Sequence, residues 1–172
     1  MTPRLRKLVL TAHITSSVGW LGAVAGFLAL AVAGLASDDV QIVRAASLTM
    51  ELTGWFVLVP LALASLVSGL VQSLGTTWGL FRHYWVLFKL LINVFATVVL
   101  LLYMQTLRFL ADVAAQTTLS SNDLDVLQSP SPVLHAAAAL LLLLVATVLA
   151  VFKPRGMTRY GRRNQRQKTA LP

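Results

Sequence analysis

Three polar side chains interrupt apolar stretches of the chain and are the first candidates for chemistry: His13, Lys89 and Asn93. Lys89 and Asn93 are four residues apart, so they share one face of a helix. Ionisable groups inside a membrane are costly and often mark a functional site. A structural role is the alternative, because a lysine near the membrane surface can extend toward lipid phosphate and a histidine can hydrogen-bond a neighbouring helix.

His13 and Lys89 are predicted to lie at the same depth. His13 follows Lys7 by six residues, and Lys89 follows His83 by six. At a rise of 1.5 Å per residue, each side chain enters the membrane to about 9 Å from the same face. Together with Asn93, one turn deeper, they would form a polar cluster in the inner leaflet that binds a ligand or cofactor.

Haem b is the leading cofactor for this cluster, because a helix-borne imidazole is a usual axial ligand and a four-helix bundle can house the macrocycle. His13 would be the metal ligand, with Lys89 either pairing a propionate or acting as a weaker axial partner, and Asn93 hydrogen-bonding nearby. At the opposite face, thioether and imidazole groups could suit Cu(I), although a place in the core or at the membrane interface explains each of them more simply. The candidate copper ligands are Met50, Met104 and His135.

No enzyme class is predicted. The sequence has no HExxH, Walker loop or GxSxG motif and no paired carboxylates within the spans. Proteolysis, nucleotide hydrolysis and acid-base glycoside chemistry therefore have no support. It also has no cysteine, which excludes disulfides and thiolate metal sites.

The composition places the chain among integral membrane proteins. Of its 172 residues, 57% are hydrophobic and 12% are charged, too few to cover a water-soluble globule. Four apolar segments are long enough to cross a membrane, which takes about 20 residues. They are residues 8–36, 52–74, 85–110 and 133–152. The sequence therefore predicts an all-α membrane protein, a single domain of four transmembrane helices in an antiparallel bundle, with a basic tail at 153–172.

The charge distribution predicts the orientation. All six acidic residues fall in the first and third connections, and the net charge is +8. Of the fourteen Lys and Arg residues, seven follow Phe152 and five more lie at the N-terminus or around the central connection. The positive-inside rule then places both termini in the cytoplasm and the protein in the cell (inner) membrane. Because topology explains the basic tail, no nucleic-acid partner is expected.

Basic residues at the cytoplasmic face predict contacts with anionic lipid. Arg82 lies in an aromatic-rich stretch typical of a membrane interface. The tail adds Arg155, Arg159, Arg162 and Arg163. A basic residue near an anionic leaflet contributes about 1 kcal/mol of attraction.

Small residues predict how the first two spans pack. Gly22 and Gly26 form a GxxxG step, and a second ridge consists of Ser65, Gly69 and Ser73. Such ridges let helix backbones approach closely, so we expect the first helix to pack on the second through both ridges. A homodimer seam is the alternative for the first ridge. Pro60 is expected to kink the second span, and residues 41–50 to extend it as a helix.

Three segments resemble an uncharacterised family of small bacterial four-helix membrane proteins with no assigned activity. They are HITSSVGWLGAVAGFLALAVAGL, PLALASLVSGLVQSLGTTWGLFRHYWVLFKLL and FKPRGMTRYGRR. More distantly, His13 with Gly19-Trp20, and Trp85 with Lys89, resemble the copper-resistance D proteins and the haem-containing bacterial protoporphyrinogen oxidase. This resemblance implies that His13 and Lys89 correspond to the first-helix histidine and third-helix lysine of those proteins. The chain lacks the oxidase's further helix-borne histidines and fourth-helix basic residue, so oxidase activity does not follow.

Three functions stay open on the sequence. The first is an inner-membrane protein of unassigned activity with an inner-leaflet ligand or cofactor site near His13 and Lys89. The second is a haem b redox protein or oxidase-like enzyme. The third is a structural or accessory subunit, acting as a homodimer or within a larger membrane complex.

Overall fold

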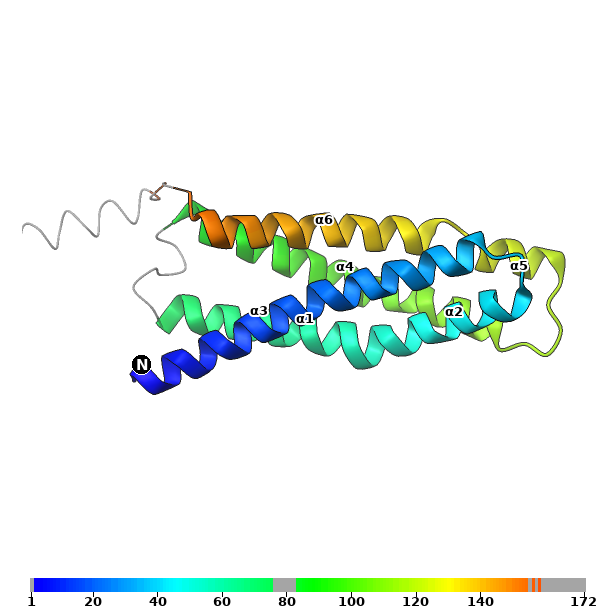
Figure 1. The fold of residues 1–172 in the computed structure, drawn as a ribbon, viewed down its shortest axis with the longest axis horizontal. Helices are drawn as coiled ribbons and strands as arrows, with labels where there is room; N and C mark the ends of the chain where they lie inside the picture. Colours follow the sequence, from blue (N-terminus) through cyan, green and yellow to red (C-terminus); the bar gives the residue numbers. More distant parts are fainter. Residues whose placement is uncertain (1, 76–82, 155, 157, 159–172) are drawn as a thin grey trace, which may run out of the picture.

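A computed structural model describes residues 2–75, 83–154, 156 and 158. Four long helical segments run antiparallel to one another (Figure 1). The first is α1 (Pro3–Ala36), and the second joins α2 (Val40–Thr53), the π-helical turn η1 (Gly54–Leu58) and α3 (Val59–Gly75). The third is α4 (Tyr84–Ala114), and the fourth is α6 (Ser131–Phe152), preceded by the short α5 (Ser121–Leu127).

Within the described residues, four helical segments are long and apolar enough to cross a membrane. The predicted all-α four-helix bundle is confirmed, and the chain is a multi-pass membrane protein. The observed helices are longer than the predicted apolar segments, because flanking turns join them: α1 begins five residues earlier than predicted, and α4 ends four residues later. The expected extension before the second span is α2, whose N-cap Asp39 accepts a hydrogen bond from the Gln41 backbone at 2.8 Å.

The four segments are arranged as a square. Both α1 and α4 pack against the α2–α3 segment and against α6. Consequently α1 and α4 lie diagonally opposite, and side chains from the two helices meet across the centre of the bundle. This arrangement decides which of the predicted polar residues can touch.

The two ends of the bundle differ in charge. The start of α1 and the end of α6 lie together at one end, which we call the basic end because Arg4, Arg6 and Lys7 are there (Figure 1). The six acidic residues lie in or beside α2, in the last turn of α4 or in α5. We call that opposite end the acidic end.

Pro60 acts through a π turn. Proline lacks a backbone N–H and its ring clashes with the carbonyl four residues back, so an α-helical ladder cannot continue through it. In η1, just before Pro60, the Val59 N–H instead bonds to the Gly54 carbonyl, five residues back. Gly54 also lets α4 come close, because a Cβ there would lie 2.8 Å from both Sδ and Cε of Met104.

Of the two predicted packing ridges, the one on α3 faces α1 and the one on α1 does not face α3. On α3, Ser65 is buried and Gly69 contacts His13, so the second ridge does face α1. The Gly22–Gly26 step, in contrast, is exposed, and a Cβ at either glycine would meet nothing within 4 Å. Its predicted packing inside the bundle is wrong, because the buried face of α1 runs through Ser16, Trp20 and Val24 and leaves these glycines outside.

Candidate functional site

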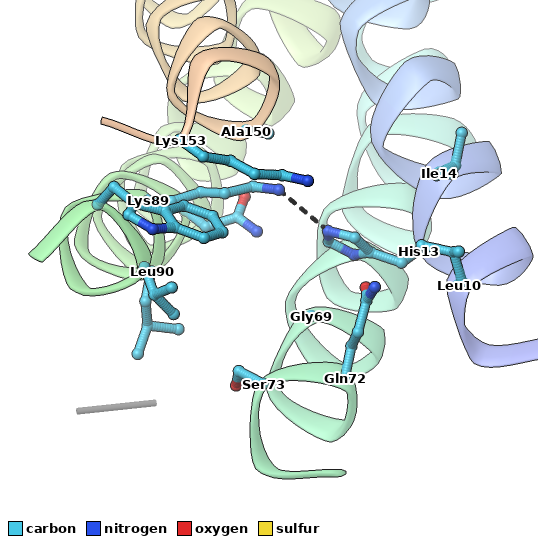
Figure 2. Close-up of a pocket in the computed structure, with 13 residues that line it drawn as sticks. Leu10, His13, Ile14, Gly69, Gln72, Ser73, Lys89, Leu90, Ala150 and Lys153 are labelled. Carbon is cyan, nitrogen blue, oxygen red and sulfur yellow. Dashed lines mark hydrogen bonds between the residues drawn. The ribbon is translucent and has the colours of Figure 1, made fainter. Parts of the chain in front are cut away.

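His13 and Lys89 meet across the centre of the bundle near its basic end. The Lys89 amino nitrogen lies 3.3 Å from Nε2 of His13. Figure 2 marks this contact with a dashed line. His13 is 8% exposed on α1, and Lys89 projects from the diagonally opposite α4. The structure therefore brings these two predicted residues into one layer.

Hydrogen bonds from α3 fix the His13 ring. Its Nδ1 lies 3.1 Å from the Ser65 carbonyl oxygen and 3.1 Å from the Ser68 hydroxyl. A carbonyl oxygen only accepts hydrogen bonds, so Nδ1 carries the proton and donates a hydrogen bond to the Ser65 carbonyl oxygen. Nε2 then presents a lone pair, which accepts a hydrogen bond from the Lys89 ammonium group.

Gly69 supplies the space that the imidazole occupies. A Cβ at this position would lie 3.0 Å from Cε1 of His13 and 3.4 Å from its Nδ1. Any larger side chain would push the ring away from α3. The glycine of the predicted packing ridge therefore has a specific partner.

Asn93 joins the cluster indirectly. Its amide nitrogen lies 3.4 Å from the Ser65 hydroxyl, which is itself 2.8 Å from the Ser17 hydroxyl. The Asn93 backbone carbonyl accepts a hydrogen bond of 2.7 Å from Thr97. Asn93 thus anchors α4 to the serine whose carbonyl holds His13, and the buried polar groups satisfy one another.

A pocket of about 350 Å³ opens beside the His13–Lys89 pair. All four helical segments line it, with polar side chains from His13, Gln72, Ser73, Lys89, Asn93 and Lys153. In Figure 2 the two lysines extend from the α4–α6 side toward His13, and Gln72 reaches in from α3. The described lining contains no carboxylate side chain, because all six acids lie in the elements of the acidic end.

A second hollow continues from this pocket along the membrane-facing side. It has a volume of about 260 Å³ and shares His13, Lys89 and Asn93 with the pocket. From there it follows the seam between α1 and α6, past Val18 and Ala146. We call it the α1–α6 groove, and its far part is apolar.

The other predicted metal ligands lie elsewhere. His135 is exposed near the start of α6, where its ring stacks on Tyr103 with centroids 4.1 Å apart. Met50 and Met104 are buried in the main hydrophobic cluster. In the part of the chain that the structure describes, no three His, Cys, Asp or Glu side chains are grouped to hold a metal ion.

The predicted lipid contacts fall outside the described residues. This applies to Arg82, Arg155, Arg159, Arg162 and Arg163. Their contact with anionic lipid stays a prediction.

Sequence reasoning missed part of the site. Ser65, Ser68 and Gln72 follow one another at helical spacing on α3, a polar stripe in an apolar span that was available as a signal. Lys153 was predicted as the first residue of the basic tail. In the structure it ends α6 as a left-handed C-cap with φ of 43°, and its side chain also lines the pocket.

No protein-family model, curated protein or solved structure matches the chain. The resemblances stated from the sequence therefore stay predictions. Function has to be inferred from the site itself.

Proposed function

We propose that this membrane protein binds the anionic head of a lipid-like molecule at the basic end of its bundle. One observation carries the proposal: the Lys89 amino group lies in a pocket between four helices, and every acidic side chain belongs to the elements of the acidic end. A charge at such a position is costly until an anion pairs with it. A phosphate or carboxylate head would supply that anion.

The donors of the pocket suit such a head. Lys89 has three N–H donors, of which His13 accepts one, so two remain for a ligand. Gln72 adds an amide donor and Lys153 a second positive charge in the lining. The α1–α6 groove begins at the same residues and offers an apolar path for a hydrocarbon chain. Head and tail would thus occupy adjoining hollows.

Lipid retention tests this proposal. Protein purified in neutral detergent would be exchanged into nanodiscs of phosphatidylcholine containing either phosphatidic acid or a fatty acid, and bound lipid counted by native mass spectrometry. We expect both anionic amphiphiles to be retained over phosphatidylcholine, and Lys89→Met to weaken retention at least tenfold. Preference for phosphatidic acid would identify a phosphate head, and preference for the fatty acid a carboxylate.

Lys7→Met is the matched control, because Lys7 is an exposed lysine at the same end of the bundle. It removes the same charge without touching the pocket. Equal lipid retention by the Lys89 and Lys7 variants would show that binding is a surface effect and that the pocket is not the site.

A haem b protein is the second candidate, favoured by the ring geometry of His13. Its Nδ1 donates to a backbone carbonyl and leaves Nε2 as the ligand atom, the arrangement that orients metal-bound histidines. The Lys89 amino group now lies 3.3 Å from that nitrogen, so haem binding requires Lys89 to move. Haem would supply redox chemistry, with His13 holding the iron and Lys89 free to pair a propionate.

An absorption spectrum separates the two candidates. Protein expressed with ample haem should show a Soret band that His13→Ala abolishes and His135→Ala leaves intact. A colourless wild-type protein would exclude haem, and a band lost only in His135→Ala would place haem at the acidic end.

A further inference from the structure

A separate hollow lies in the half of the bundle nearer the acidic end. It has a volume of about 230 Å³ and is bounded by α1, η1, α4 and α6. A protein cavity of about 150 Å³ holds benzene, so this one is large enough for a substituted ring. Its walls include Trp20, Phe27 and Phe95, which suit an aromatic guest.

The hollow is reached from the membrane. Phe95 on α4 is 58% exposed, and Ala138 on α6 is exposed as well, although both line the cavity. A ligand would therefore enter between α4 and α6 from the bilayer. Only a lipophilic molecule is concentrated there.

Polar groups stand at one point of this lining. The Tyr103 hydroxyl lies 3.1 Å from the Ser131 hydroxyl, and Nδ1 of His135 lies 2.9 Å from the Ser131 carbonyl oxygen. Because the carbonyl accepts, Nδ1 carries the proton and Nε2 is left as an acceptor. Stacking on Tyr103 at an interplanar angle of 19° fixes the imidazole in this orientation.

We propose that this cavity binds a lipophilic ring compound that carries a phenolic hydroxyl. The ring lies among Trp20, Phe27 and Phe95, and the hydroxyl donates to Nε2 of His135. The Tyr103 hydroxyl is a second polar contact for the same group. The cavity and the anion pocket share no lining residue. Trp20 lines both the cavity and the α1–α6 groove.

Trp20 provides a direct reporter. The chain has four tryptophans, so replacing Trp55, Trp78 and Trp85 with Phe leaves Trp20 alone in the cavity wall. Bromine quenches indole fluorescence on contact, so the probes are 4-bromophenol and its methyl ether, 4-bromoanisole. We expect saturable quenching by the phenol, with at least fivefold higher affinity than for the ether. A variant retaining only Trp55, which is 46% exposed on the outer surface, measures partition into detergent.

Two substitutions test the assignment. His135→Phe preserves the ring stack and removes the acceptor, so the affinities for phenol and ether should come within twofold of each other. Ala139→Phe fills the cavity and should abolish saturable quenching by both probes. Lys89→Met should leave both affinities unchanged, which separates failure here from failure of the anion site.

The proposal is overturned if quenching of Trp20 shows no more saturation with probe concentration than quenching of Trp55. It is also overturned if the ether binds wild-type protein as well as the phenol does, or if His135→Phe keeps the fivefold preference. His135 is exposed, so its substitution gives a result even if the cavity-filling variant does not fold.

Discussion

Lys89 and His13 satisfy each other only in part. The imidazole accepts one hydrogen bond from the ammonium group, but a neutral ring cannot balance its positive charge. If Lys89 stabilises the fold, its substitution should lower the stability of the protein. If Lys89 binds a ligand at the cost of stability, its substitution should leave the stability unchanged or raise it.

Lys89→Met is expected to leave the ligand-free protein as stable as the wild type, or more stable by about 1 kcal/mol. The reason is that methionine has a similar volume to lysine and carries no charge that must be removed from water. Thermal unfolding in neutral detergent measures this. A loss of several degrees in melting temperature would assign Lys89 a structural role. His13→Leu is the contrasting variant, since it leaves the Lys89 amino group without its hydrogen-bond acceptor and should cost about 1–3 kcal/mol.

Gly69→Ala is expected to disturb the site through His13. The added Cβ would lie 3.0 Å from the ring, so the imidazole must move, and we expect a loss of about 1–2 kcal/mol and weaker retention of anionic lipid. Gly22→Ala is the matched control on α1. Its Cβ meets nothing within 4 Å, and alanine favours a helix over glycine by up to about 1 kcal/mol. If both variants melt alike, close packing at Gly69 is unimportant.

The sequence predicted the layer but not the hydrogen bonds within it. Equal spacing from Lys7 and from His83 correctly placed His13 level with Lys89, because helix rise is constant. This spacing does not predict how α3 is rotated about its axis. That rotation places Ser65 and Ser68, and not Asn93, in contact with the imidazole. Side-chain partners across helices depend on such rotations.

Among the elements, the second span depends on a close contact at its π turn. Gly54→Ala would place a Cβ 2.8 Å from the buried end of Met104 and should cost about 1–3 kcal/mol. Met104→Ala alone should cost about 2–5 kcal/mol, because it leaves a cavity. Their losses should not add, since the shortened side chain makes room for the new methyl group. Thermal unfolding of all four proteins gives the coupling, and strict additivity would disprove the contact.

Element types were predicted better than element faces. Apolar runs of sufficient length and Pro60 marked the spans and the break, because both signals are local. The GxxxG step was assigned to the wrong surface, since a small residue permits close packing without requiring it. Trp20, two residues before Gly22, is 2% exposed, and its bulk is what determines the inward face of α1.

For the whole molecule, we propose that the basic end faces the cytoplasm. The support is the separation of charge between the two ends, to which Arg44 and Arg108 are the two exceptions. Arg44 has a structural role. Its guanidinium donates to the backbone carbonyls of Gln116 and Thr117, just beyond the end of α4. This arginine thus satisfies backbone carbonyls of the connection that follows α4, and it does not argue against the proposed orientation.

Reporter fusions test the orientation. A reporter placed after Ser121, at the start of α5, and one placed after Gln167, in the basic tail, should report opposite compartments, with the tail in the cytoplasm. Identical reports from the two positions would contradict four spans, and exchanged reports would invert the bundle.

The π turn gives the length of the second span an unusual importance. A π turn holds one more residue than an α turn of the same rise, so it absorbs one residue without rotating the helix that follows it. Each residue of an α-helix turns by about 100°. If all the residues of η1 were wound as an α-helix instead, the extra residue would rotate Ser65, Ser68 and Gly69 by about that angle, away from His13. Among sequences otherwise like this one, a chain without the π turn should therefore need one residue fewer between Asp39 and Ser65 to assemble the pocket.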